Sequence, residues 1–284
     1  MTDTLIPEDS TTQDGAPLAP LPAEPVPDIG YGQVFADFYD RIFPRDAGAE
    51  RTARTLADWH PGGPALELGV GTGRIAVPLA RLAGPVTGVD SSPEMLDRLR
   101  AALDATAAPI TPVHGDIRTY ADAERYGLVY CVCATLSMIL DADGQRAAVA
   151  RAADRLAPGG TFVVETHNPA FVLDLHEGRR RTSYFAPYPE PDTGLQSYST
   201  LLPEQSLWHV SHIWHEPGRT RIGSELSRLT TPDEVDAYAA AAGLVPVSRH
   251  ADWAGTPFDP EHSALYVTRY ARRADTPEAD DGRR

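Results

Sequence analysis

The chain has 284 residues, enough for one large hydrophobic core or for a core with a small additional subdomain. Its formal net charge is −15, and all 25 basic residues are arginines. This acidic composition contains no basic stripe, so we expect no binding to nucleic acid or to an anionic membrane. It favours a small substrate that is neutral or cationic.

The ends of the chain carry few signals of folded structure. Residues 1–28 hold six prolines among acids and small residues and predict a disordered leader. The stretch lacks the basic and apolar regions of a secretory signal, and no apolar run in the chain is long enough to span a bilayer. We therefore expect a cytoplasmic protein. The tail, residues 274–284, is also predicted to be disordered.

An amphipathic segment with aromatic residues follows the leader. The aromatic side chains of Tyr31, Phe35, Phe38 and Tyr39 predict a packing helix with an aromatic stripe over residues 31–43. A second helix is expected at 46–59, and a first strand at 64–68.

The most informative stretch of the sequence is the glycine-rich segment 65–80. In it, a short apolar run that contains Glu67 is followed by glycines at 69, 71 and 73. It predicts a strand, a tight turn and the start of a helix. Glycine accepts positive φ and lets a ligand approach the main chain, and the first N–H groups of the helix are free to bind that ligand.

This turn differs from the dinucleotide-binding fingerprint G-x-G-x-x-G at two places. The third glycine of that fingerprint would fall at position 74, which is Arg74. Glu67 would also be an unfavourable neighbour for a bound pyrophosphate. A carboxylate here is better suited to a cation or a hydroxyl group.

Two further acids follow strands at regular intervals downstream. Residues 86–90 form a second apolar run that ends in Asp90, and the sequence Ser91-Ser92-Pro93 then predicts the start of a helix to about residue 105. After a third strand at 110–114 comes the sequence Gly115-Asp116-Ile117.

The pattern E-x-G-x-G-x-G, taken with these two later motifs, closely resembles the class I S-adenosylmethionine-dependent methyltransferases over residues 31–170. The resemblance implies that the glycine loop wraps the amino-acid end of the cofactor, that Asp90 bonds both ribose hydroxyls, and that Asp116 binds the adenine amine. It also implies that Tyr39 closes over the methionine end. The cofactor-binding residues expected on this basis are Tyr39, Glu67, Gly69, Gly71, Gly73, Asp90, Ser91, Met95, Asp116, Ile117 and Cys133.

The next segments complete an alternation of strands and helices. Residues 126–135 are continuously apolar, as in a central parallel strand covered on both faces. Cys131 and Cys133 within it are expected to be reduced core residues, and its end, through Ser137, is expected to border the transferable methyl group. A helix at 145–156, a stop at 157–160 and a strand at 161–166 follow. This alternation predicts an α/β fold with a doubly wound, Rossmann-like sheet of seven strands, whose ligand lies beyond the carboxyl ends of the strands.

The pattern changes at residue 168. The cofactor-binding core is expected to span 29–167. Strand-like runs at 196–202, 207–214 and 219–230 predict a small antiparallel β insertion over the active site, spanning 168–230, which is also a possible homodimer contact. The core resumes over 231–273 with a helix that starts after Thr230 or Thr231 and ends at Gly243, followed by strands at 244–251 and 264–271.

Methyl transfer from a sulfonium depends mainly on holding the nucleophile close to the methyl group, and a base is needed only when the acceptor begins protonated. His167, directly after the strand at 161–166, is the candidate base. The alternative is a histidine at the rim of the site that bonds a loop carbonyl.

Three histidines at intervals of three, His209, His212 and His215, do not indicate a metal site, because alternate residues of a strand face opposite sides. Trp208 and Trp214 share a face with His212 and either enclose an acceptor or form the core of the insertion. The residues expected to line the substrate site are Tyr31, Ser137, Asn168, Tyr184, Trp208 and His212.

The sequence thus predicts a methyltransferase that acts on an N or O atom of a small molecule, in a specialised biosynthetic pathway. The arrangement is similar to that of small-molecule N-methyltransferases, including those acting on glycine or amino sugars. Two alternatives remain open at this stage. One is a protein that binds the same cofactor without methylating a substrate, and the other is a nicotinamide-dependent oxidoreductase.

Overall fold

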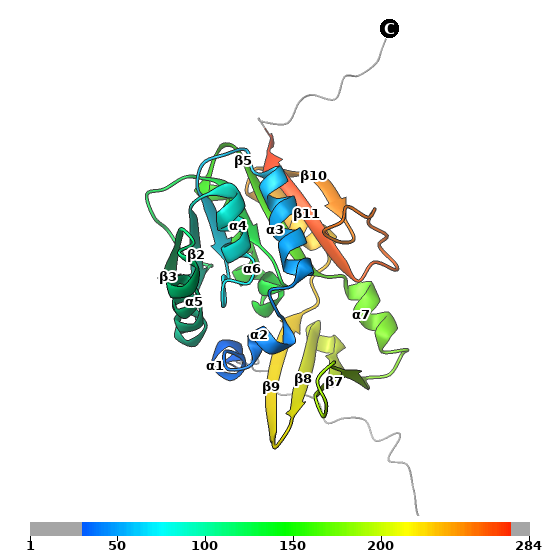
Figure 1. Cartoon of the computed structure of the whole chain (residues 1–284). Coiled ribbons are helices and arrows are strands. Elements are labelled where there is room, and N and C mark those ends of the chain that lie inside the picture. Colours follow the sequence, from blue (N-terminus) through cyan, green and yellow to red (C-terminus); the bar gives the residue numbers. More distant parts are fainter. Residues whose placement is uncertain (1–29, 274–284) are drawn as a thin grey trace, which may run out of the picture.

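The computed structural model describes residues 30–273, so the leader and the tail predicted from the sequence lie outside the described residues. Figure 1 shows a large sheet with helices above a smaller, separate sheet. The large sheet has seven strands, and the smaller sheet is antiparallel and has four. The strand order in the large sheet is β10-β11-β5-β4-β1-β2-β3. Its strands are β1 (Ala65–Leu68), β2 (Val86–Asp90), β3 (Ile110–His114), β4 (Tyr126–Cys131), β5 (Leu156–His167), β10 (Leu244–His250) and β11 (Leu265–Arg272).

The predicted doubly wound α/β sheet is confirmed. The first five strands pair in parallel, and β11 is antiparallel to both β5 and β10. Every residue of β1 and β4 is buried, because helices cover both faces of the sheet. The helices are α3 (Ala47–Trp59), α4 (Ala76–Ala83), α5 (Pro93–Thr106), α6 (Ala142–Arg155) and α8 (Pro232–Ala241).

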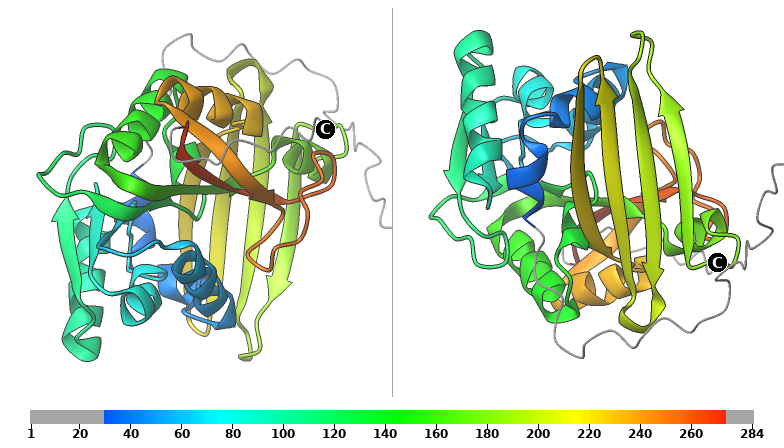
Figure 2. Two further views of the ribbon diagram at one scale, coloured as in Figure 1. Left: turned by 90° about the horizontal axis from the view of Figure 1, so that it is seen from above. Right: turned by 90° about the horizontal axis from the view of Figure 1, so that it is seen from below.

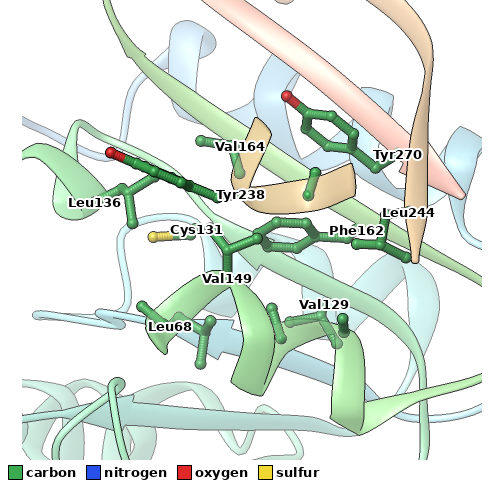
Figure 3. Packing of buried hydrophobic residues seen from close by; sticks show 14 of the residues in the cluster. Leu68, Val129, Cys131, Leu136, Val149, Phe162, Val164, Tyr238, Leu244 and Tyr270 are labelled. Carbon is green, nitrogen blue, oxygen red and sulfur yellow. The ribbon is translucent and has the colours of Figure 1, made fainter. Parts of the chain in front are cut away.

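Alternate side chains of each central strand enter different cores. Val129 and Cys131 of β4 pack on the side of α6 and α8, whereas Leu128 and Tyr130 pack on the side of α3, α4 and α5. In Figure 3, Phe162 of β5 lies in the first of these cores with side chains from α6 and α8. The two cores hold the strand ends in place, and these ends carry the predicted motifs.

Local capping residues set the starts of three helices. The Asp46 carboxylate accepts hydrogen bonds from the backbone N–H groups of Gly48 and Ala49 at the start of α3. Ser92 caps α5 in the same way, and Thr231 and Glu234 form a reciprocal capping box on α8.

Three expected boundaries are wrong. The segment 31–43 forms two short helices, α1 (Tyr31–Phe35) and α2 (Tyr39–Ile42), rather than one. Residues 157–160 belong to β5, because Leu156 already pairs with Tyr126. β4 ends at Cys131, and Cys133 lies beyond it with a positive φ of 56°, so the two cysteines do not share a strand face.

The second sheet contains four strands in the order β6-β7-β8-β9: β6 (Arg181–Pro187), β7 (Gly194–Leu202), β8 (Leu207–Glu216) and β9 (Arg219–Arg228). We call it the lid sheet; it is seen broadside in the right view of Figure 2. The sequence predicted β7, β8 and β9 but missed β6 and the short helix α7 (Pro169–Leu175). Two 3₁₀ turns, Thr135–Met138 and Pro203–Gln205, complete the elements of the described chain.

Within residues 30–273, no helix combines the length and the apolar character that crossing a membrane requires.

Candidate active site

A cavity of about 820 Å³ lies among the carboxyl ends of the central strands, the helices α1 and α2, and the inner face of the lid sheet. It collects most of the residues that the sequence singled out, although they come from distant parts of the chain. Those that line it are Tyr31, Tyr39, Glu67, Gly69, Gly71, Asp90, Ser91, Met95, Asp116, Ile117, Cys133, His167, Tyr184, Trp208 and His212.

The glycine loop forms one wall of the cavity. Glycine is favoured at two of its positions for different reasons. Gly69 has a φ of 83°, and a Cβ atom there would lie 2.3 Å from Cγ2 of Thr135. Gly71, at a φ of 53°, has no atom within 4 Å of its would-be Cβ and therefore borders open space. Gly73 is not among the lining residues; a Cβ there would lie 2.5 Å from Leu99 of α5, so this glycine serves helix packing.

The Asp90 carboxylate lies across from this loop at the end of β2. It accepts hydrogen bonds from the backbone N–H of Gly71 (2.7 Å) and of Ser92 (2.9 Å). Burial raises the pKa of Asp90, although these two bonds oppose the rise. The carboxylate is thus held in one orientation at the cavity wall, where its remaining lone pairs suit hydroxyl donors.

Glu67 lies at the base of the cavity and is nearly inaccessible to solvent. Its carboxylate accepts a hydrogen bond of 2.9 Å from the Tyr130 hydroxyl. Burial raises its pKa to about 8. A carboxyl group in this setting ionises readily only when a positive charge arrives beside it.

Asp116 also lines the cavity, but its carboxylate is already engaged. Nε of Arg118 donates to both of its oxygens, at 3.0 and 2.9 Å, and Nη2 donates to Oδ2 at 2.6 Å. Arg118 lines the cavity as well. The contact with an adenine amine that the family resemblance implies would therefore share this carboxylate with Arg118.

The helices α1 and α2 cover the methionine end of the expected cofactor site. The Thr72 hydroxyl donates to Asp40 (2.6 Å), and Arg45 donates to the Thr72 carbonyl (2.7 Å), so the glycine loop is tied to this cover. Tyr31 and Tyr39 of this cover line the cavity, and the centroids of their rings are 6.4 Å apart. Burial raises the pKa of both hydroxyls, which keeps them neutral.

Two further cavity residues, Arg74 and Glu165, were not predicted from the sequence. Nη2 of Arg74 donates to Sγ of Cys133 at 2.7 Å, which places a guanidinium beside the glycine loop. Glu165 of β5 accepts from the Cys133 N–H (3.2 Å) and from Nε1 of Trp253 (3.1 Å). Both residues carry a signal in retrospect, since Arg74 is the residue that breaks the dinucleotide fingerprint and Glu165 is an acid in a buried strand.

The other end of the cavity extends under the lid sheet. His167 of β5 makes an edge contact with Trp208 of β8, with ring centroids 5.0 Å apart. Tyr184 of β6, His212 of β8, and Glu225 and Ser227 of β9 complete this end. We call it the acceptor compartment, because it adjoins the Cys133 side of the cavity and is separate from the Asp90 wall.

Two residues expected to touch the substrate lie elsewhere. Ser137 is buried against the Thr166 hydroxyl at 2.5 Å, and neither it nor Asn168 lines the cavity. Nδ2 of Asn168 donates to the carbonyls of Pro260 and Ser263, while its Oδ1 caps α7. Both side chains thus act within the protein, and we do not propose them as substrate contacts.

The lid sheet contacts the segment of α1 and α2 through its edge strand β9. Phe35 of α1 packs against Gly223 of β9, where a Cβ would lie 2.7 Å from the ring. Asp37 is shared by Arg98 of α5 (2.8 Å) and Arg221 of β9 (3.4 Å). These contacts fix the lid over the cavity without any residue of the glycine loop.

The three histidines of β8 alternate as a regular strand requires. His212 is buried on the inner face, whereas His209 and His215 lie on the outer face. Among residues 30–273, no three His, Cys, Asp or Glu side chains gather closely enough to hold a metal ion. Trp214 shares the inner face but packs against Tyr188, at 4.7 Å between centroids, and so belongs to the core of the lid.

The end of the cavity that the glycine loop, Glu67 and Asp90 form fits a nucleoside that carries an amino acid. Gly71 leaves open space at the loop, Asp90 presents a fixed carboxylate, and the Glu67 carboxylate is buried beside an aromatic cover. The residues that would hold S-adenosylmethionine are therefore Asp90 for the ribose and the loop 69–71, Glu67 and Tyr39 for the methionine part.

Comparison with known proteins agrees with this fit. Residues 65–160 match the family model described as a methyltransferase domain. The CcbJ methyltransferase from Streptomyces caelestis is 33% identical, with a TM-score of 0.78 over 87% of this chain and 99% of that protein.

Two further relatives are more distant. The dTDP-4-amino-2,3,4,6-tetradeoxy-D-glucose N,N-dimethyltransferase of Saccharopolyspora spinosa is 28% identical over 227 residues, which cover 75% of this chain and 86% of that protein. The structure of CalS10, an amino pentose methyltransferase from Micromonospora echinaspora, has a TM-score of 0.62 at 21% identity and covers 81% of this chain and 95% of that one. Taken together, the motif, the cavity and these similarities show that the chain belongs to the class I S-adenosylmethionine-dependent methyltransferases.

Proposed function

We propose that this enzyme transfers the methyl group to an amine nitrogen of a sugar-like small molecule. The observation that carries the proposal is the acceptor compartment, where Trp208 contacts His167 and where Tyr184 and, from α1, Tyr31 line the same cavity. Aromatic rings cover the apolar faces of a sugar, and the polar groups between them bind its hydroxyl and amine substituents. The amino-sugar methyltransferases among the relatives support an amine as the acceptor.

When bound, S-adenosylmethionine supplies a methyl group on a sulfonium, whose bonding electron pair remains on the sulfur as the methyl leaves. The residues of this chain have the tasks of orienting the acceptor, excluding water and accepting a proton. An ammonium has no free lone pair, so the acceptor nitrogen must first lose a proton. His167 lies at the cavity end of β5, which supports the proposal that its imidazole takes that proton from the nitrogen.

Replacing His167 with alanine should lower kcat about 10-fold and leave the Kd for the cofactor unchanged. We expect a loss smaller than general-base catalysis often gives, because water also accepts protons from a fraction of the amine. Steady-state kinetics and calorimetry measure the two quantities. His262→Ala, which removes an exposed histidine outside the cavity, is the matched control. An undiminished kcat in the His167 variant would mean that this histidine is only structural.

The choice of acceptor is tested with matched amine and hydroxyl compounds. We would incubate the protein with methyl-labelled S-adenosylmethionine and either dTDP-4-amino-2,3,4,6-tetradeoxy-D-glucose or the same nucleotide sugar with a hydroxyl in place of the amine. A panel of free amino sugars and their hydroxyl counterparts extends the comparison. We expect label only on amine-bearing compounds, as detected by mass spectrometry. Label on the hydroxyl compounds and none on the amines would overturn the proposal.

A further inference from the structure

Glu225 is a carboxylate on the inner face of the lid sheet. It lies in β9 opposite Val210 of β8, and the next inner-face position along β9, Ser227, also lines the cavity. The Glu225 side chain is 18% exposed, and this exposure faces the acceptor compartment. No motif of the sequence marked this residue.

The other carboxylates of the cavity all have hydrogen-bond donors from the protein. Tyr130 donates to Glu67, backbone N–H groups donate to Asp90, Asp141 and Glu165, Ser92 donates to Glu94, and Arg118 donates to Asp116. Glu225 differs from all of these. Its ion-pair partner is Nε2 of His212, which lies 3.5 Å from Oε1 of Glu225.

His212 is itself fixed from behind. The Ser197 hydroxyl lies 2.8 Å from Nδ1 of His212, and both side chains are buried on the inner face of the lid. The Phe35 ring makes a T-shaped contact with the same imidazole, with centroids 5.8 Å apart. The imidazole therefore holds the Glu225 carboxylate at one side of the compartment but leaves most of its acceptor capacity unused.

Aromatic rings also line the compartment, one from α1 and one from the same face of the lid sheet. Tyr31 lines it from α1, and the negative charge of Glu225 is among the causes, after burial and Tyr39, that raise the pKa of Tyr31. Trp208 lines it from β8. A carboxylate beside aromatic rings in an enclosed space attracts a cation that can donate hydrogen bonds more strongly than it attracts a neutral hydroxyl.

We propose that Glu225 is the residue that recognises the acceptor amine, by binding its protonated form in the compartment between Tyr31, Trp208 and His212. This inference rests on the proposed function, because it names the group that makes an amine the preferred acceptor. His212 and Ser197 are positioning residues that orient the carboxylate. A charge-assisted hydrogen bond to a buried carboxylate distinguishes an ammonium from a hydroxyl group of the same size.

The test uses two cofactor analogues and needs no knowledge of the natural acceptor. S-adenosylhomocysteine carries no group in the position of the methyl, whereas sinefungin carries a protonated amine there. Calorimetry gives the Kd of each ligand for the wild-type protein and for Glu225→Gln. We expect the ratio of the two Kd values to shift against sinefungin by about 5- to 10-fold in the variant, while the Kd for S-adenosylhomocysteine is unchanged.

Two further variants serve as controls. Glu225→Asp keeps the charge and should retain most of the preference for sinefungin. Glu190→Gln removes an exposed carboxylate outside the cavity and should leave both Kd values unchanged. A ratio that stays at the wild-type value in Glu225→Gln, or an equal loss of affinity for both ligands, would overturn the inference. Failure to methylate any amine would instead count against the proposed function, because the affinity ratio is measured without turnover.

Discussion

The variant Asp90→Ala should bind S-adenosylmethionine and S-adenosylhomocysteine about 10- to 150-fold more weakly than the wild-type protein. The structure places the Asp90 carboxylate at the cavity wall with two backbone donors, which fix its orientation. Its free lone pairs are the expected acceptors for both ribose hydroxyls. Hydrogen bonds to a charged group of this kind contribute about 1.5 to 3 kcal/mol, and about 1.4 kcal/mol corresponds to a tenfold change in Kd.

Calorimetric titration of both ligands measures this loss. Asp90→Asn separates charge from shape, because the amide retains one acceptor oxygen for Gly71 or Ser92, and an intermediate loss is expected. Asp97→Ala, which removes an exposed carboxylate of α5, should bind normally. An unchanged affinity in Asp90→Ala would refute the assignment of the ribose site.

Glu67 should make the cofactor-free protein less stable as the pH rises. Burial raises its pKa in the folded state to about 8, from the ordinary value of 4.5. Below pH 4.5 Glu67 is protonated in both the folded and the unfolded state, so the stability that its raised pKa contributes is fully present. As the pH rises toward 8, the unfolded state loses the proton while the folded state retains it. The free energy of unfolding then falls by up to about 1.4 kcal/mol per pH unit, until the folded carboxyl also ionises.

The variant Glu67→Gln removes this titration but keeps an oxygen that accepts from Tyr130. We expect it to be more stable than the wild type by roughly 2 to 4 kcal/mol near pH 8 without ligand, and nearly equal in stability near pH 5. Urea titrations at several pH values measure the free energy of unfolding of each protein. Groups that titrate equally in both proteins do not affect the difference between them. Glu124→Gln, at an exposed site, should follow the wild type. If the free energy of unfolding changed with pH in the same way for Glu67→Gln and the wild type, that result would contradict a raised pKa of Glu67.

The parts of the fold that could be predicted are those encoded locally. The strands β1, β2 and β4 are short apolar runs followed by turn residues, and Asp46, Ser92 and Thr231 cap their helices through neighbours within three residues. The cofactor end of the cavity could be predicted for the same reason. Glu67, Gly69, Gly71 and Asp90 belong to contiguous motifs at the carboxyl ends of adjacent strands.

The parts that could not be predicted depend on contacts between distant segments. β6 is largely exposed on both faces, so it has no apolar alternation, and α7 is only seven residues long. Asn168 resembled a site residue because it follows β5, but the carbonyls of the 260–263 loop use its amide. Alternation in β9 groups Glu225 with Ser227, yet only the packing of the lid shows that this face is the inner one.

The decisive measurement is a crystal structure of the protein with S-adenosylhomocysteine. We expect the ribose hydroxyls on the Asp90 carboxylate and the amino-acid part along the loop 69–71. We also expect the sulfur atom to face the compartment that Tyr31, His167 and Glu225 line. A ligand bound elsewhere, or a sulfur atom turned away from that compartment, would contradict the assignment of both ends of the cavity.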